Sequence, residues 1–297
     1  MIGIIETNLK YDNVFETMVS QMVHYINENN LNAVVLGISG GIDSTVVACI
    51  LREVSNRINQ ERPFRFVGVS MPTETTNPDE FKISELVGNA FCDEFKIIDI
   101  TDEVKNIVIP RVGEFVNPLI HNNVIRIGNV KSRLRMIHLY DLAKAYNGIV
   151  VGTDNYTEYL LGYSTIGGDG LFDYCPIQYL WKTEVYRLAD YCLNQYIEKK
   201  QWDKVHAVSD SINIEPQAGL GITSNDMQEI GADNYFVVDD ILYTYINLKP
   251  GDKENPTVER YGIDTVLTVI DRMHKNEYKR NLPILPSRFN YDKVLDN

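Results

Sequence analysis

A glycine-rich loop near the amino terminus has the composition of a phosphate-binding site. It consists of Gly37, Ile38, Ser39, Gly40, Gly41, Ile42, Asp43 and Ser44, and it lies between an apolar run and a predicted helix. Gly40 and Gly41 allow the backbone to turn tightly and approach an anion, while the helix N-terminus and the serine hydroxyls supply hydrogen-bond donors. The sequence therefore predicts that this loop binds the phosphates of a nucleotide.

Asp43 suggests the chemistry of the loop, since a carboxylate beside phosphates is favourable when a Mg²⁺ ion lies between them. The loop lacks the Gly-Lys-Ser/Thr ending of a Walker A motif, which disfavours ordinary γ-phosphoryl transfer. It resembles the SGGxDS loop of the N-type ATP pyrophosphatases, which cleave ATP between the α- and β-phosphates and adenylate a carboxyl or carbonyl oxygen. The alternative is a Ser/Gly turn that only caps a core helix.

Alternating apolar runs and amphipathic stretches must position this loop. Helices are predicted at Tyr11–Asn30, Thr45–Val54, Phe81–Phe91, Val130–Tyr146 and Thr183–Tyr191, and strands at Ala33–Ile38, Phe64–Met71, Lys96–Ile100 and Ile149–Gly152. Asn129 is expected to cap the long helix, and Asn147-Gly148 to end it. The order predicts an α/β fold with a doubly wound, Rossmann-like parallel sheet, whose ligands bind beyond the carboxyl ends of the strands, and with additional C-terminal helices.

A second group of motifs indicates which substrate the enzyme uses. The runs Asn129-Val-Lys-Ser-Arg-Leu-Arg-Met136 and Val150-Val-Gly-Thr-Asp-Asn155, with Glu158, resemble the ammonia-dependent NAD synthetases. So do Leu161-Gly-Tyr163, Gly168-Asp-Gly170, Asp173 and Lys182-Thr-Glu-Val-Tyr186, and the resemblance spans roughly residues 11 to 290. It implies a sheet of the adenine nucleotide alpha hydrolase-like type. It also implies a single domain over residues 1–297 without a glutaminase domain, so that free ammonia is the nitrogen donor.

The resemblance implies a role for several individual residues. Asp43 and Glu158 match Mg²⁺ ligands, Asp43 and Lys182 are expected to be catalytic, and ATP, the co-substrate, is contacted by residues 37 to 44, Thr153, Lys182 and Gln217. The deamido-NAD contacts are implied at Arg133, Asp173, Tyr278 and Lys279. Carboxylates suit Mg²⁺, a lysine suits a phosphate that gains charge, and arginine suits paired phosphates.

Each of these residues also has a simpler interpretation. Arg133 fits a solvated helix face beside Lys131 and Arg135, and Asp173 fits a turn. Glu158 fits a surface acid, and Lys182 fits the first turn of a helix. The position of each residue within the family's motifs favours the functional role.

Three positions depart from the family pattern. Ile166 stands where a lysine commonly contacts deamido-NAD, Gln217 where Ser or Thr commonly contacts ATP, and Tyr278 where His commonly precedes Lys279. Loss of a charge-assisted bond at Ile166 would weaken dinucleotide binding by about 1.5–3 kcal/mol. Polar segments at Asn77–Asp79 and Gln217–Asp226 are candidates for a lid that excludes water.

Bulk composition excludes other classes of protein. The formal net charge of −13 over 297 residues disfavours a nucleic-acid partner, and no apolar run approaches the roughly 20 residues of a spanning helix. The four cysteines are far apart and lack metal-ligand spacing, so reduced, buried thiols are expected. We expect a cytoplasmic protein, and the family resemblance implies a homodimer, with the helix Val130–Tyr146 as a candidate interface.

The resemblance implies a two-step reaction in which the nicotinate carboxylate attacks the ATP α-phosphorus and ammonia then displaces AMP. One rival is a tRNA-modifying relative, against which the acidic charge and isolated cysteines count. A second rival is a sensor of NAD metabolites that has lost turnover, suggested by the three departures. The presence of Asp43, Glu158 and Lys182 favours the enzyme.

Overall fold

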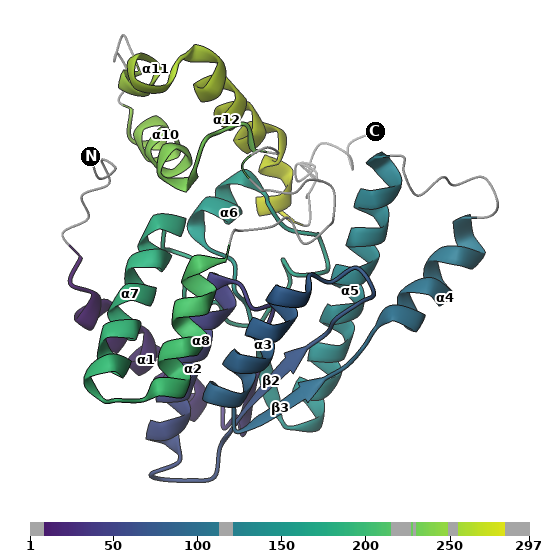
Figure 1. The fold of residues 1–297 in the computed structure, drawn as a ribbon, viewed down its shortest axis with the longest axis vertical. Coiled ribbons are helices and arrows are strands. Elements are labelled where there is room, and N and C mark those ends of the chain that lie inside the picture. The colour runs from purple at the N-terminus through teal and green to yellow at the C-terminus, as the bar shows by residue number, and fades with distance from the viewer. Residues whose placement is uncertain (1–8, 113–120, 215–226, 228–229, 249–254, 283–297) are drawn as a thin grey trace, which may run out of the picture.

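Four parallel strands form the central sheet of the computed structural model, which describes residues 9–112, 121–214, 227, 230–248 and 255–282. The strands are β1 (Ala33–Gly37), β2 (Arg65–Ser70), β3 (Glu94–Ile97) and β4 (Gly148–Val151). They are ordered β3-β2-β1-β4, and β1 pairs with both β2 and β4. Figure 1 labels β2 and β3 among the helices that flank the sheet. The predicted α/β fold with a parallel sheet is confirmed.

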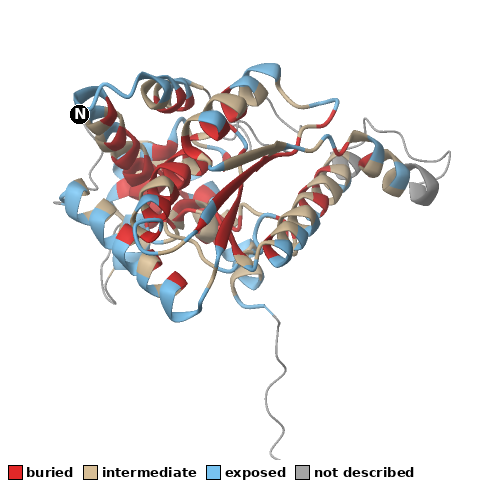
Figure 2. Cartoon of the chain, turned by 90° about the horizontal axis from the view of Figure 1, so that it is seen from below, coloured by how far each residue is buried: buried red, intermediate tan, exposed pale blue. Residues whose placement is uncertain are grey.

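Helices cover both faces of the sheet. One layer contains α1 (Tyr11–Glu28), α2 (Ile42–Ile58), α3 (Pro78–Phe91), α7 (Lys182–Glu198) and α8 (Trp202–Asn213). The other contains α4 (Thr101–Val112) and α5 (His121–Ala145). Within β1, Val34 and Leu36 face the first layer and Val35 faces the second. A strand buried on both faces has to be apolar throughout, which explains the continuous apolar run (Figure 2).

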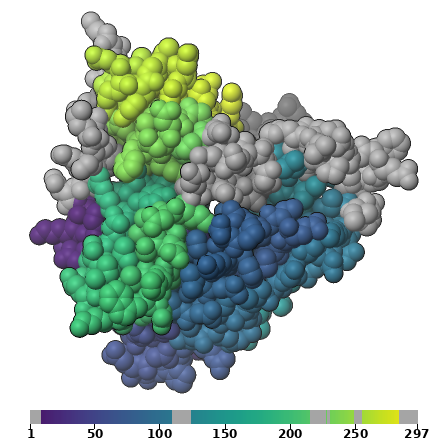
Figure 3. All heavy atoms as spheres, viewed as in Figure 1, coloured from purple at the N-terminus to yellow at the C-terminus, as the bar shows by residue number. Residues whose placement is uncertain are grey.

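A group of helices from the second half of the chain has its own apolar core beyond one end of the sheet. It consists of α6 (Tyr156–Leu161), α10 (Tyr235–Asn247), α11 (Pro256–Tyr261), α12 (Ile263–Lys275) and the short 3₁₀ helix η2 (Glu277–Arg280). Leu161, Trp181, Val238 and Val269 are buried within it. Figure 3 shows α10 to α12, coloured green to yellow, above the helices that flank the sheet. The predicted additional C-terminal helices are therefore present.

Several predicted boundaries were wrong. Helix α3 begins at Pro78 rather than at Phe81, and the side chain of Asn77 accepts a hydrogen bond from the Asp79 N–H, so the lid candidate Asn77–Asp79 forms the start of this helix. Helix α5 begins well before Asn129, which therefore lies inside the helix and does not cap it. The Oδ1 atom of Asn129 instead accepts a hydrogen bond from the hydroxyl of Thr165. The other lid candidate, Gln217–Asp226, lies outside the described residues.

The third strand starts and ends earlier than predicted, and a helix follows it that the sequence pattern did not reveal. The Asp93 carboxylate accepts a hydrogen bond from the Phe66 N–H, which starts the pairing between β2 and β3 early. After Ile97 the Asp99 carboxylate accepts a hydrogen bond from the Thr101 N–H, which begins α4. Polar side chains therefore lie just before this strand and at the start of the helix after it.

The cysteines and the apolar content of the helices were both the subject of predictions. All four cysteines are free thiols and are buried or half-buried, as predicted. Among the described residues, none of the helices is long and apolar enough to cross a membrane.

Candidate active site

The order of the strands places two loops side by side. From β1 the chain moves outward through β2 and β3, and then returns to add β4 on the other side of β1. The loops after β1 and β4 therefore diverge at neighbouring strand ends, which is where open α/β sheets bind ligands. The first is the glycine-rich loop, and the second contains Thr153 and leads into α6. The fold thus brings two predicted motifs to one crevice.

The glycine-rich loop depends on Gly40. Its φ of +93° lies in the left-handed region, and a Cβ atom at this position would lie 2.3 Å from the backbone oxygen of Glu80. After it, the Ser44 hydroxyl donates to the Gly41 carbonyl at 3.0 Å, and the Gly41 N–H donates to the Ser39 hydroxyl at 3.2 Å. These contacts fix the turn in which the backbone enters α2 and bring its N–H groups together.

Lys182 connects two elements that are far apart in the sequence. Its Nζ atom lies 2.5 Å from Oδ2 of Asp43 in the first turn of α2, and 3.2 Å from Oε1 of Glu158 in α6. The Lys182 side chain is 4% exposed, so this ion pair is largely shielded from water. The structure therefore brings together the three residues that the sequence assigned to metal binding and catalysis.

Asn155 fixes the relative position of the two acids. Its Nδ2 donates to Oδ1 of Asp43 at 2.8 Å, while its Oδ1 accepts from the Glu158 N–H at 3.0 Å. The Glu158 carboxylate in turn accepts from the Asn155 N–H, which completes a capping box at the start of α6. The fully buried Asn155 thus holds the Asp43 carboxylate through its side chain and the Glu158 carboxylate through its backbone N–H.

Negative charge is in excess at this centre. Burial raises the pKa of Glu158 to about 7, with Lys182 opposing and Asp43 adding to the shift. Burial, followed by repulsion from Glu158 and Asp169, also raises the pKa of Asp154 well above its ordinary value. Burial alone would lower the pKa of Lys182, but the carboxylates of Asp43 and Glu158 raise it. One buried cation therefore faces more than one carboxylate.

Asp43 and Glu158 are the side chains of this centre that could hold a metal ion. Within the part of the chain that the structure describes, no three His, Cys, Asp or Glu side chains lie close enough to form a complete metal site. Mg²⁺, however, is usually held by one or two carboxylates together with substrate phosphates and water. Asp43 and Glu158 provide two such carboxylates beside the glycine-rich loop, and the excess negative charge favours a cation. The residues therefore fit Mg²⁺ that arrives with a nucleotide.

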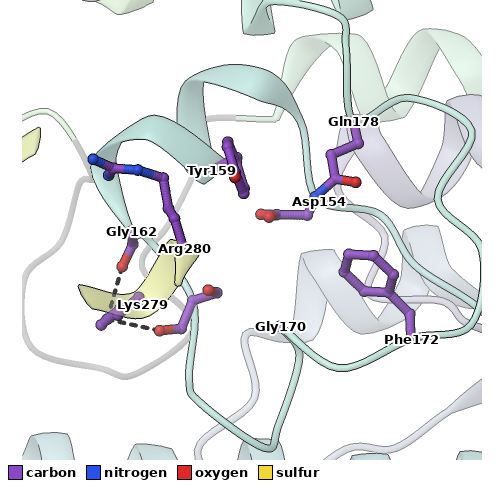
Figure 4. Close-up of a pocket in the computed structure, with 9 residues that line it drawn as sticks. Asp154, Tyr159, Gly162, Gly170, Phe172, Gln178, Lys279 and Arg280 are labelled. Atoms are coloured by element: carbon purple, nitrogen blue, oxygen red, sulfur yellow. Dashed lines mark hydrogen bonds between the residues drawn. The ribbon is translucent and has the colours of Figure 1, made fainter. Parts of the chain in front are cut away.

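A pocket opens beside this centre. Its wall includes Asp154, the rings of Tyr159 and Phe172, and Lys279. In Figure 4 the Asp154 carboxylate points into the open space below Tyr159. Lys279 donates through Nζ to the carbonyls of Gly162 at 2.7 Å and Ser164 at 2.8 Å. The pocket thus extends from an acid near the ion pair to one of the predicted dinucleotide contacts.

Two other predicted dinucleotide contacts, Arg133 and Asp173, do not line this pocket. Arg133 is exposed on α5 and donates through Nε to the carbonyl of Ile166 at 3.1 Å. The Ile166 side chain is 39% exposed and has no charge to offer. The Asp173 carboxylate accepts from the Val150 N–H at 2.8 Å and from the Tyr140 hydroxyl at 3.2 Å. Asp173 therefore also closes the outer edge of β4.

One predicted dinucleotide contact and one predicted ATP contact remain. Tyr278 is 47% exposed in η2, next to Lys279. Gln217, the predicted ATP contact, lies outside the described residues.

Comparison with known proteins identifies the family. The sequence model of the family described as NAD synthase matches residues 14–283. The chain belongs to the NAD synthase family. The match covers every predicted site residue, from Gly37 to Lys279.

Relatives within the NAD synthase family match over nearly the whole chain. The NH(3)-dependent NAD(+) synthetase of Thermococcus sibiricus is 36% identical over 283 residues, which are 94% of this chain and 98% of that protein. That of Pyrococcus horikoshii is 34% identical, over 94% of this chain and 96% of its own length.

Solved structures share the fold. The NAD⁺ synthetase of Burkholderia pseudomallei, 25% identical, covers 93% of this chain and 92% of its own with a TM-score of 0.67. An NMN synthetase from Francisella tularensis, 22% identical, covers 95% of this chain and 100% of its own with a TM-score of 0.73.

Sequence reasoning missed several residues of the centre. Asn155 lies within one of the family motifs, and its spacing from Glu158 is that of a capping box, which is the signal that reveals its contact with the helix start. Asp239 was missed as well, although a charged residue within the apolar run of α10 is a sign of a buried polar contact. The contact between Asn155 and Asp43 joins residues 112 positions apart, and no local pattern predicts it.

Proposed function

We propose that this protein is an ammonia-dependent NAD synthetase, which converts ATP, deamido-NAD and ammonia into NAD, AMP and pyrophosphate. Membership of the NAD synthase family supports the reaction, and the names of the relatives support ammonia as the nitrogen donor. The observation that carries the proposal is the bridge from Lys182 to Asp43 and Glu158, next to the glycine-rich loop. This arrangement suits the displacement of pyrophosphate from the α-phosphorus of ATP.

In this proposal the glycine-rich loop holds the pyrophosphate part of ATP. Backbone N–H groups at the start of α2, with the hydroxyls of Ser39 and Ser44, donate to the phosphate oxygens. Thr153, in the neighbouring loop, and Gln217 add ATP contacts. Mg²⁺, held by Asp43 and Glu158, would neutralise charge on the phosphates. Because Lys182 occupies the space between these acids, it is placed to turn its ammonium group toward the α-phosphate as negative charge develops there.

The dinucleotide would occupy the adjoining pocket. We assign Arg133, Asp173, Tyr278 and Lys279 to deamido-NAD, with Lys279 at the pocket itself. The nicotinate carboxylate would enter between the rings of Tyr159 and Phe172 and reach the ion-pair centre. The protein thereby aligns two polyanions that repel one another in water, which is an entropic and electrostatic contribution to the rate.

The chemistry then follows from this alignment. A nicotinate carboxylate oxygen attacks the α-phosphorus, the bond to the β-phosphate oxygen breaks, and pyrophosphate leaves. Ammonia next attacks the activated carbonyl carbon, loses a proton, and AMP departs with the oxygen that came from the carboxylate. No residue of the protein needs to form a covalent bond. The pocket has to exclude water, which would hydrolyse the adenylate.

We further propose that residues 1–297 form a single catalytic domain that assembles as a cytoplasmic homodimer. Ile137 on α5 is 55% exposed, although it is a large apolar side chain on a long helix. An apolar residue at this place suits an interface around a two-fold axis. Light scattering coupled to size exclusion should give twice the mass of 34.0 kDa, and a charged substitution at Ile137 should shift it toward the monomer.

The experiment that tests the proposed function follows NAD, AMP and pyrophosphate from ATP, Mg²⁺ and ammonium, with and without deamido-NAD. All three products should form in equal amounts and only when deamido-NAD is present. Nicotinate mononucleotide is tested in parallel, because one structure of similar fold is described as an NMN synthetase. Preference for the mononucleotide would show that it, and not deamido-NAD, is the substrate. Saturable binding of deamido-NAD without turnover would indicate a sensor.

A further inference from the structure

Asp239 is a buried acid that lies outside the set of predicted site residues. It lies in α10, a helix of apolar residues, and its relative exposure is 0%. An ionised carboxylate is stable at such a position only if hydrogen bonds replace its contacts with water. The Asp239 carboxylate accepts from the Thr157 hydroxyl at 2.5 Å, from the Thr183 N–H at 2.9 Å and also from the Thr183 side chain.

Both donors lie in the first turn of a helix that carries a catalytic-centre residue. Thr157 is the second residue of α6 and is followed by Glu158, while Thr183 is the second residue of α7 and follows Lys182. First-turn N–H groups have no partner within their own helix, and the helix N-terminus favours negative charge. One carboxylate thus joins the starts of two helices.

A further contact closes the connection at Lys182. The Lys182 N–H donates to the Thr157 hydroxyl oxygen at 2.9 Å, so the same hydroxyl links Asp239 to the lysine backbone. One helical turn before Asp239, the ring of Tyr235 lies 5.1 Å from Lys182 Nζ. Helix α10 therefore lies against the ammonium group of Lys182 and is linked to its backbone through the Thr157 hydroxyl.

We propose that Asp239 is a positioning residue for amide formation, which holds the first turns of α6 and α7 so that Glu158 and Lys182 face Asp43. This inference rests on the proposed function, since it takes Lys182 and Glu158 to act on ATP. Asp239 itself contacts neither the pocket wall nor the glycine-rich loop among its hydrogen bonds. Its effect is carried through Thr157 and Thr183.

The neighbouring residue provides a matched control. Asp240 is equally buried, at 1% exposure, but its carboxylate accepts from Arg260 at 2.6 Å and from the Tyr261 hydroxyl at 2.8 Å. These partners belong to α11, and the contact fixes α10 within the C-terminal helices rather than at the catalytic centre. Substitution of Asp240 therefore perturbs a buried acid of the same helix without touching α6 or α7.

The test compares Asp239→Asn and Asp240→Asn in steady-state assays of NAD formation. Asparagine at 239 can still accept from Thr183, but it presents an amide N–H to Thr157, so the Thr157 hydroxyl loses the acceptor for its proton. We expect kcat to fall about 10- to 100-fold for Asp239→Asn, with KM for deamido-NAD and ammonium nearly unchanged. Asp240→Asn should leave kcat close to wild type, whatever it does to thermal stability.

A second pair of variants tests the inference even if the Asp239→Asn protein does not fold. Thr157→Val removes the hydroxyl with little change in shape, whereas Thr157→Ser retains it, so serine should restore most of the kcat that valine loses. Equal activity of the two variants, or a wild-type kcat in folded Asp239→Asn, would overturn the inference. A wild-type enzyme that makes no NAD would instead overturn the proposed function, and the two failures are therefore distinguishable.

Discussion

Substitution of Gly40 by alanine tests the geometry of the glycine-rich loop. Gly40 has a φ of +93°, and an added Cβ atom would lie 2.3 Å from the Glu80 carbonyl oxygen and 3.1 Å from the Ser84 N atom. These are backbone atoms of α3, which cannot turn aside as a side chain would. The loop therefore has to move away from α3, or α3 has to move away from the sheet.

Two contributions determine how much Gly40→Ala destabilises the protein. A left-handed backbone costs a residue with a Cβ atom about 1–2 kcal/mol, and overpacking against fixed atoms costs about 1–3 kcal/mol more. We therefore expect Gly40→Ala to lower the free energy of unfolding by roughly 2–5 kcal/mol. Because the loop has to shift, KM for ATP should also rise about 10- to 100-fold in the protein that remains folded.

Gly41 provides the control within the same loop. Its φ is −74°, which alanine adopts freely, and a Cβ atom there would only contact the Ser39 hydroxyl at 3.4 Å. Urea unfolding of the two variants should therefore show a loss of less than about 1 kcal/mol for Gly41→Ala. A Gly40→Ala protein as stable as Gly41→Ala, with an unchanged KM for ATP, would refute this account of the loop.

Four further predictions concern charged groups and one missing charge. Lys182→Met should lower kcat about 10²- to 10³-fold while ATP still binds, as measured by calorimetry, and a wild-type kcat would contradict its role. Ile166→Lys should lower KM for deamido-NAD about tenfold or more if a cation at this position reaches the dinucleotide, and no change would exclude that contact. Asp93→Ala should cost about 2–4 kcal/mol in urea unfolding, because its carboxylate accepts from Arg52, Ser55 and the Phe66 N–H. Burial raises the pKa of Asp239 from 3.8 to about 6. The protonated group therefore contributes stability that is fully present below about pH 3.8 and is lost as the pH rises through 6. At about 1.36 kcal/mol per pKa unit, the stability that is lost is about 3 kcal/mol. The stability difference between wild type and Asp239→Asn should therefore shift by about that amount between pH 4 and 7.5, and a constant difference would contradict the shift.

The layered fold was predictable because its strands are buried on both faces. A strand such as Val34–Val35–Leu36 needs apolar residues on each side, and this requirement is visible in the sequence itself. The start of α3 was less predictable, because its cap is a polar side chain, Asn77, in a segment whose composition resembles a loop. Boundaries set by one hydrogen bond leave only a weak pattern.

Some residues of the candidate site could be predicted from the sequence and others could not. Asp43, Glu158 and Lys182 were recognisable because each lies in a motif, and the fold brings all three together. The residues that hold them, Asn155 and Asp239, act through contacts 112 and 82 positions apart along the chain. Such contacts depend on the packing of α6, α7 and α10, which periodicity does not encode.

The most direct test of the central claim follows the oxygen of the nicotinate carboxylate. Deamido-NAD labelled with ¹⁸O in this group is incubated with ATP, Mg²⁺ and ammonium, and the AMP and pyrophosphate are examined by mass spectrometry. Attack of the carboxylate on the α-phosphorus predicts one ¹⁸O atom in each AMP and none in pyrophosphate. Label in pyrophosphate, or AMP without label while NAD forms, would contradict adenylation at this site.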